Sequence, residues 1–292
     1  MRVHSGALAP SGAFSDAVRG VATVCDHGGP GAGTLGVDQM SDKSAIEWTD
    51  ATWNPTTGCD RTSPGCDRCY ALAIAKRLKA MGVGKYHHDG DPRTSGPGFA
   101  VTLQEDALHL PYRWARPRVV FVNSMSDLFH DAVPVEFIRR VFVMAATPQH
   151  TYQVLTKRSR RLAQLSDSLP WPSNVWMGVS VESDRYAFRV NHLRAVPAAV
   201  RFVSVEPNLG PVPSLCLDGI DWAIAGGESG PGARPILRDW VVDLRERCRD
   251  SDVAFFFKQS AGSTGGPVPE LCRSALLALR VGRLGGNSPV TS

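Results

Sequence analysis

Apolar runs of strand length recur along the middle of this 292-residue chain, and segments with helical spacing of their apolar residues follow most of them. The eight runs are residues 46–48 with Trp53, 99–103, 119–122, 152–155, 175–181, 200–205, 222–225 and 253–257. The helical patterns are residues 69–81, 135–146, 185–195 and 239–249. Strands that alternate with helices form a parallel sheet covered by helices. The pattern therefore predicts an α/β fold, a parallel (β/α) barrel of the TIM type, either complete with eight strands or partial and open with six.

The two ends of the chain lack this periodicity. Residues 1–40 are rich in Gly, Ala and Ser, and we expect them to be a disordered extension, with Met40 as the natural start. Residues 263–292 mix Gly, Ser and Pro around one short apolar run at 275–279. We therefore predict a barrel domain at residues 41–262, followed by a poorly ordered or divergent tail.

Composition excludes several classes of protein. A hydrophobic fraction of 43% and a charged fraction of 21% are those of an ordinary globular protein. No segment approaches the ~20 apolar residues that cross a bilayer, and the N-terminus lacks the apolar core of a signal peptide. We therefore expect a cytoplasmic protein without a membrane partner. A net charge of +4 tolerates a polyanionic partner but is not strongly basic.

Polar side chains stand where six of the eight predicted strands end, from the run at 119–122 onward. They are Asn123, Ser124, Asp127, Lys157, Ser180, Glu182, Glu206, Glu228 and Lys258. In a parallel barrel the carboxyl ends of all strands line one mouth, which is where barrel enzymes place their active sites. Acidic groups turned into such a mouth seldom serve stability alone. The sequence therefore predicts a polar catalytic mouth.

Three of the seven cysteines form a cluster in one loop. Six residues separate Cys59 from Cys66 and two separate Cys66 from Cys69, whereas the other four cysteines are scattered. Three thiolates in a tight turn are a ligand set for a soft metal or an iron–sulfur cluster, and three ligands leave one coordination position open. The loop leads directly into a predicted helix, whose first N–H groups can hydrogen-bond thiolates or cluster sulfides.

A structural zinc site is the alternative interpretation of the same cysteines. It requires four protein ligands, and His87 or His88, eighteen and nineteen residues after Cys69, could supply the fourth. The predicted barrel favours the cluster, because a structural zinc site need not lie at a barrel mouth. Spacing alone leaves both occupants open.

The residues also resemble known families. Cys66, Cys69 and the aromatic Tyr70 are similar to the second half of the cluster motif of the radical S-adenosylmethionine superfamily, although the six-residue first gap departs from its usual three. Seven motifs in order resemble the uncharacterised phage family named after gene products thirty-seven and sixty-eight, which is radical S-adenosylmethionine-like. They are SAIEWTDATWNP (44–55), SPGC (63–66), FVNSMSDLF (121–129), LTKR (155–158), GVSVE (178–182), GGESG (226–230) and FFKQ (256–259). After Gln259 the sequence diverges from that family.

The resemblance implies a radical S-adenosylmethionine enzyme with a 4Fe–4S cluster on Cys59, Cys66 and Cys69. S-adenosylmethionine would bind the open iron, an electron donor would reduce the cluster, and the products would be methionine and a 5′-deoxyadenosyl radical. The cofactor-binding residues it implies are Tyr70, Asn123, Ser124, Asp127, Lys157, Ser180 and Glu228. The catalytic residues it implies are Glu182, Glu206 and Lys258.

The substrate is open at this stage. The phage context and four cations within residues 157–161 suggest a nucleic acid. The competing function is a zinc-stabilised nucleic-acid-binding protein of phage or mobile-element origin, without catalysis. A partner protein is compatible with either function.

Overall fold

The computed structural model describes residue 46, residues 48–229 and residues 232–259. The chain divides into two units, residues 1–38 and 39–292, and every described residue lies in the second. The predictions made for residues 1–40 and 263–292 lie outside the described residues.

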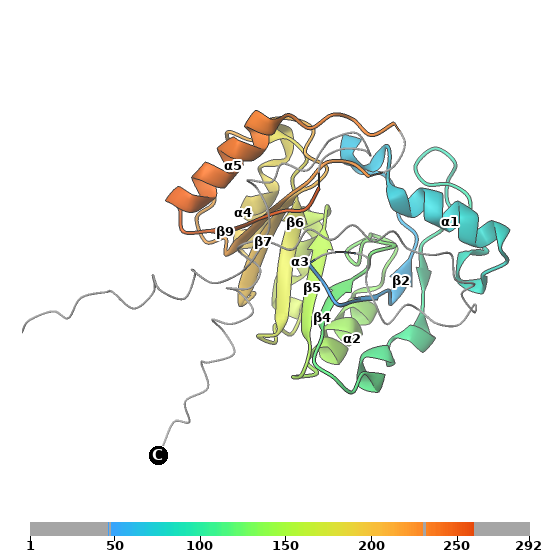
Figure 1. The fold of residues 1–292 in the computed structure, drawn as a ribbon. Helices are drawn as coiled ribbons and strands as arrows, with labels where there is room; N and C mark the ends of the chain where they lie inside the picture. Colours follow the sequence, from blue (N-terminus) through green and yellow to red (C-terminus); the bar gives the residue numbers. More distant parts are fainter. Residues whose placement is uncertain (1–45, 47, 230–231, 260–292) are drawn as a thin grey trace, which may run out of the picture. The chain divides into compact units, whose positions relative to one another are not determined.

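Seven parallel strands form one sheet, in the order β1-β4-β5-β6-β7-β8-β9 (Figure 1). Their bounds are β1 Ala51–Trp53, β4 Val119–Val122, β5 Thr151–Thr156, β6 Val175–Ser180, β7 Val200–Val205, β8 Trp222–Ala225 and β9 Ala254–Phe257. Within the described residues β1 pairs only with β4 and β9 only with β8, so the sheet does not close into a ring. The fold is therefore a partial (β/α) barrel, which confirms the predicted class in its open form.

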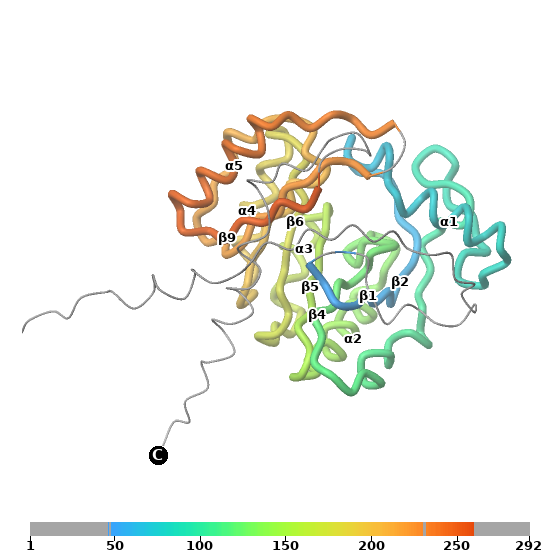
Figure 2. Tube along the Cα trace, viewed as in Figure 1, coloured from blue at the N-terminus to red at the C-terminus, as the bar shows by residue number. Residues whose placement is uncertain are grey.

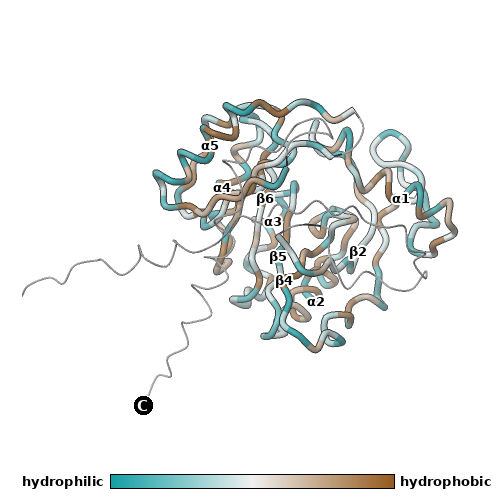
Figure 3. Tube along the Cα trace, viewed as in Figure 1, coloured by the Kyte–Doolittle hydropathy of each residue, from teal (hydrophilic) through white to brown (hydrophobic). Residues whose placement is uncertain are grey.

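Five α-helices accompany the strands. Their bounds are α1 Tyr70–Ala80, α2 Val135–Ala145, α3 Ser159–Leu165, α4 Arg189–Arg194 and α5 Arg238–Asp250. Four of them, α2 to α5, bury apolar residues in the main core against one face of the sheet. In Figure 3, hydrophilic and hydrophobic segments alternate along α5, as expected of a helix that buries one side and exposes the other. None of the helices in the described part is long and apolar enough to cross a membrane.

The first two strand predictions were right only in part. The first strand of the sheet is β1, which contains the predicted Trp53, whereas residues 46 and 48 lie before it; Figure 2 places β1 beside β2 (Thr56–Thr57). The run at 99–103 contributes only β3 (Thr102–Leu103), which pairs antiparallel with β2 outside the large sheet. Phe99 instead packs in a small core with Ala71 and Ala75 of α1. Tertiary packing overrides the local pattern because Phe99 has a helix to pack against.

The inner face of the sheet carries an aromatic cluster. Side chains alternate between the two faces of a strand, and the residues opposite the helices include Phe121, Trp176, Phe202, Trp222 and Phe256. Trp48 covers them, with its ring 4.8 Å from that of Phe121 and 5.8 Å from that of Trp222. The aromatic cluster fills the inner face, and polar residues follow it towards the carboxyl ends of the strands.

Candidate functional site

The predicted polar residues continue the inner-face register of their strands. Counting by two from the aromatic cluster, Asn123 follows Phe121, and the same step reaches Lys157, Ser180, Glu182, Glu206, Glu228 and Lys258. Two direct contacts join neighbouring strand ends: Lys157 Nζ lies 2.6 Å from Glu182 Oε1, and Lys258 Nζ lies 2.5 Å from Glu206 Oε1. The structure therefore brings these side chains together at the carboxyl end of the sheet.

The cysteine loop begins beside β4 and ends at α1. Gly58 has a φ of 84°, and a side chain there would lie 2.0 Å from the carbonyl oxygen of Ala100, so only glycine fits. Cys66 ends a single 3₁₀ turn that Pro64 opens, and its carbonyl accepts the N–H of Cys69. Cys69 then occupies the residue before the first turn of α1. The sequence forms this turn locally because Pro64 fixes φ at the first position of the turn.

Glu182, at the end of β6, is fully buried and has three partners. Its Oε1 accepts hydrogen bonds from Ser63 Oγ (2.5 Å) and Lys157 Nζ (2.6 Å), and its Oε2 accepts one from Arg189 (2.8 Å). Burial alone would raise the pKa of Glu182, but Lys157, Arg189 and the Ser63 hydroxyl outweigh it and lower the pKa below its ordinary value. The carboxylate is therefore ionised and its oxygens are occupied.

Glu228, after β8, is bound in the same way by Arg234. The Arg234 N–H donates to Oε2 at 2.8 Å, and its guanidinium donates to Oε1. Burial would raise the pKa of Glu228, yet the hydrogen bonds and charge of Arg234 lower it overall. Arg234 Nη2 also donates to the carbonyl oxygen of Pro64 at 2.7 Å. Arg234 thus joins the end of β8 to the cysteine loop.

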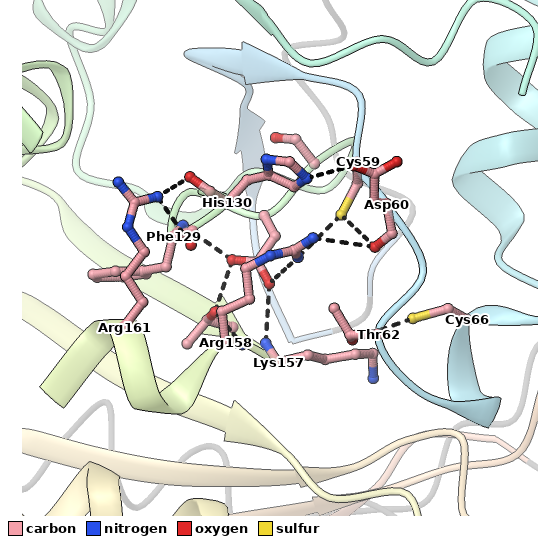
Figure 4. A network of polar contacts seen from close by, with 12 residues as sticks. Cys59, Asp60, Thr62, Cys66, Phe129, His130, Lys157, Arg158 and Arg161 are labelled. Carbon is pink, nitrogen blue, oxygen red and sulfur yellow. Dashed lines mark hydrogen bonds and ion pairs between the residues drawn. The ribbon is translucent and has the colours of Figure 1, made fainter. Parts of the chain in front are cut away.

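Arg158, which follows β5, contacts Cys59 (Figure 4). Arg158 donates to Cys59 Sγ at 3.4 Å, to the carbonyl oxygen of Asp60 at 3.2 Å and to Asp127 at 3.2 Å. Asp127 also accepts hydrogen bonds from Thr156 Oγ1 at 2.7 Å and from two backbone N–H groups. Asp127 therefore orients Arg158 and a turn, and every oxygen of its carboxylate has a protein partner.

His130 contacts the same loop through Asp60. Its Nδ1 accepts the N–H of Ala132 at 3.1 Å, so a neutral ring carries its proton on Nε2, which lies 3.0 Å from Asp60 Oδ2. Burial and the charge of Arg158 lower the pKa of His130, and Asp60 opposes them only in part. The imidazole therefore donates as a neutral group.

Asn123 has a left-handed backbone conformation at the mouth. It directly follows β4 with a φ of 63°, and its Nδ2 donates to Thr56 Oγ1 at 2.8 Å. Its Oδ1 is buried and has no partner within the described structure. A left-handed residue with an unpaired buried acceptor is typical of a ligand-binding position. The neighbouring Ser124 bonds Asn54 through its hydroxyl, and its carbonyl accepts the Tyr70 hydroxyl at 2.6 Å.

The remaining predicted residues differ in exposure and in how many hydrogen bonds they can still accept. Within the described residues Glu206 pairs only with Lys258, and both side chains are about a fifth exposed (19% and 20%). The carbonyl of Ser180 accepts a hydrogen bond from Arg189, and its side chain is buried beneath the mouth. Glu206 therefore has acceptor capacity to spare, which Glu182 and Glu228 do not.

The three thiols experience different fields. Burial raises the pKa of Cys59 to about 12, against the opposing charge of Arg158, and burial also raises the pKa of Cys69. Burial would raise the pKa of Cys66 too, but Lys157 and hydrogen bonds from Thr62 and Ser63 lower it overall. Figure 4 shows the Lys157 side chain extending towards Thr62 and Cys66. Cys66 is therefore the thiol most ready to lose its proton.

The three cysteines have the right chemistry to bind a metal or cluster as thiolates, but their side chains are not arranged as a closed ligand site. Cys59, Cys66 and Cys69 are all free thiols. Across the described part of the chain no three or more His, Cys, Asp or Glu side chains converge closely enough to hold a metal ion. The three sulfurs would have to approach one another to share a metal. The four-ligand zinc site with His87 or His88 is likewise not assembled, and His87 instead lies 3.4 Å from the carbonyl of Gly82.

The basic run at 157–161 serves internal contacts. Lys157 pairs with Glu182, Arg158 with Asp127, and Arg161 donates to the backbone carbonyls of Phe129, His130 and Val133. Of its four cations only Arg160 is exposed. Three of the four cations thus have partners within the protein, and phosphate binding by this run stays a prediction.

Sequence reasoning missed Ser63, Arg189 and Arg234. Ser63 precedes Pro64 and has the residue type that caps a helical turn, which is a signal that could have been read. Arg189 and Arg234 carry no local signal, because each acts on a carboxylate that only the fold brings near. Lys157 and Glu182 were predicted separately, and their pairing is a product of adjacent parallel strands.

No curated protein sequence matches the chain. The solved structures it resembles include two mutants of spore photoproduct lyase, each 12% identical to it. One has a TM-score of 0.46 over 73% of this chain and 76% of that chain, and the other a TM-score of 0.44 over 72% and 64%. The family described as protein of unknown function (DUF5131) matches residues 43–268, and since this is more than half of the chain, the protein belongs to that family.

Proposed function

We propose that this protein is a radical S-adenosylmethionine enzyme that holds a 4Fe–4S cluster on Cys59, Cys66 and Cys69. The observation that carries the proposal is the position of the three free thiols on one loop at the polar mouth of a partial (β/α) barrel. When bound, the cluster and S-adenosylmethionine would supply one-electron reduction of the sulfonium to a 5′-deoxyadenosyl radical. The protein would bind and orient the cofactor and the substrate.

Two cations suit the mouth to an anionic group. Arg158 contacts Cys59 directly, and the charge of Lys157 favours the thiolate of Cys66. Three thiolates carry more negative charge than a cluster core neutralises. Nearby guanidinium and ammonium groups stabilise the net negative charge that remains. The backbone N–H groups at the start of α1, directly after Cys69, add a positive field.

The unpaired Oδ1 of Asn123 gives the mouth a place for a donor. A hydroxyl or ammonium group of a small ligand would satisfy it, and the strained backbone holds the acceptor in place before binding. The Glu206–Lys258 pair offers a second polar contact, with capacity for a substrate or cofactor group. Glu182, Glu228 and Asp127 position other residues, so we assign contact with ligands to Asn123, Glu206 and Lys258.

Anaerobic purification and iron–sulfide reconstitution test the proposal. We expect about four irons and four labile sulfides per chain. We also expect an electron paramagnetic resonance signal of the reduced protein that changes when S-adenosylmethionine is added. Single replacement of Cys59, Cys66 or Cys69 by Ala should abolish the brown cluster. Cys216→Ala is the matched control, since Cys216 is exposed and lies outside the site.

A colourless protein with one zinc and no labile sulfide would overturn the proposal. The zinc-stabilised binding protein would then be the better description. An intact cluster whose spectrum ignores S-adenosylmethionine would retain the metal site but refute the radical chemistry.

A further inference from the structure

We infer that two latches fasten the segment between Cys59 and Cys66 across the mouth: Ser63 on Glu182, and Arg234 on the carbonyl of Pro64. These latches fix the backbone of the loop at Ser63 and Pro64 before any metal binds, whereas the three sulfurs must still approach one another when it binds. The inference deepens the proposed function, on which its consequence for cofactor binding rests, but the latches themselves can be tested without a cofactor.

The first latch is rigid at both ends. Ser63 is buried, and its hydroxyl donates to Glu182 Oε1 at 2.5 Å. Lys157 and Arg189 hold the carboxylate, which has no exposure to solvent. The backbone of the loop also packs directly on this side chain, since a Cβ at Gly65 would lie 2.4 Å from Glu182 Cγ. The loop thus rests on a fixed carboxylate rather than on a mobile surface group.

The second latch binds the next residue of the loop. Arg234 donates to the carbonyl oxygen of Pro64 at 2.7 Å, and its Nη1 lies 3.9 Å from Asp67. Its other N–H groups are committed to Glu228, which is 3% exposed in its side chain. An arginine held by a buried carboxylate is a preorganised donor for a backbone carbonyl. The two latches therefore tie adjacent loop residues to the ends of β6 and β8.

The width of the cysteine gap follows from this crossing. The loop starts beside the segment that follows β4, where Gly58 bridges to Ser126, and Ser63 reaches the end of β6. Two strand spacings amount to ~10 Å. Four residues from Cys59 to Ser63 span up to ~14 Å, whereas a gap three residues shorter would leave one residue and ~3.5 Å for the same distance. A three-residue gap would therefore be too short for the first latch, whereas the six-residue gap of this chain is long enough.

Hydrogen exchange of the metal-free protein tests the latches. The N–H groups of Cys66, Asp67 and Cys69 are bonded within the loop, to the carbonyls of Ser63, Pro64 and Cys66. In Ser63→Ala these amides should exchange at least ~10-fold faster, which corresponds to ~1.4 kcal/mol in the opening equilibrium and is at the low end for a hydrogen bond to a charged group. Strand amides of β6 should be unchanged.

Two further variants keep the test independent of a single side chain. Gly65→Ala should accelerate the same amides, because its new methyl group displaces the loop from Glu182. Ser214→Ala is the matched control: it also removes a serine hydroxyl from a carboxylate, that of Asp184 at 2.9 Å, but outside the loop. It should leave loop exchange within about twofold of wild type.

The outcomes separate the two proposals. Faster loop exchange in Ser63→Ala and Gly65→Ala supports the first latch, on Glu182, whether or not the wild type takes up iron. Unchanged exchange in both variants overturns that latch, even if the wild type binds a full cluster. If wild type binds iron and the latches hold, both variants should also bind fewer irons per chain at limiting iron.

Discussion

Glu182→Gln should be the most destabilising conservative change at the mouth. The substitution keeps the shape of the side chain but removes the charge between Lys157 at 2.6 Å and Arg189 at 2.8 Å. Both cations would stay in place without a counter-charge, and the Arg189 side chain is only 4% exposed. Loss of one partner of a buried ion pair costs about 3–5 kcal/mol.

Glu206→Gln is the matched control for this prediction. Glu206 also pairs with a lysine at the end of a strand, at 2.5 Å, but with one cation instead of two and with both side chains about a fifth exposed (19% and 20%). Water can solvate the cation that remains, so the cost should be ~1 kcal/mol or less. The two variants make the same chemical change and differ mainly in burial and in the number of cations.

Urea unfolding under reducing conditions, followed by circular dichroism, measures the difference. With a slope of about 3 kcal/mol per M, a loss of 3–5 kcal/mol lowers the midpoint of Glu182→Gln by about 1–1.7 M, and that of Glu206→Gln by about 0.3 M or less. Equal midpoints for the two variants, at unchanged slope, would refute the assignment of Glu182 as a buried structural anchor.

Two further predictions concern the core and the acid stability. Gly178→Ala should cost about 1–3 kcal/mol in the same assay, because its Cβ would lie 2.4 Å from the ring of Phe202, whereas Gly84→Ala meets no atom within 4 Å and should be near neutral. Burial and the charge of Arg158 lower the pKa of His130, so the folded protein disfavours the imidazolium relative to the unfolded chain. The contribution of His130 to the free energy of unfolding is therefore complete above the ordinary histidine pKa of ~6.5. It is lost as the pH falls from there towards the lowered pKa. The free energy of unfolding should decrease across that window, and His130→Gln should reduce the slope; an unchanged slope would contradict the prediction.

The fold was predictable where the strand pattern was regular. The six apolar runs from 119 onward became β4 to β9 because each is flanked by a helix or turn and is buried on both faces. The runs at 46–48 and 99–103 have the same composition but lie where the chain enters the sheet and where it passes under α1. No local property distinguishes an apolar run that pairs with a strand from one that packs against a helix.

The candidate site was predictable in position but not in its pairing. Parallel strands place their carboxyl ends together, so Glu182, Glu206 and Glu228 could be assigned to one mouth from the sequence. Which of them is free for chemistry depends on cations that come from other elements: Arg189 from α4 and Arg234 from the segment before α5. These partners are set by three-dimensional packing, and their residue type alone fits a surface arginine equally well.

The pairing changes which acidic group is suited to act on a substrate. A carboxylate whose oxygens are held by two cations and a hydroxyl, as in Glu182, resists protonation and has little capacity to accept a further hydrogen bond. Glu206 has one partner, Lys258, and is partly exposed, so a substrate can reach both members of the pair. Because proton transfer requires a group that the substrate can reach, Glu206 with Lys258 is the acid–base pair that we propose for this mouth. Glu182, after β6, instead positions the loop that carries the thiols. The positioning role and the proposed acid–base role thus lie at the ends of neighbouring strands, β6 and β7.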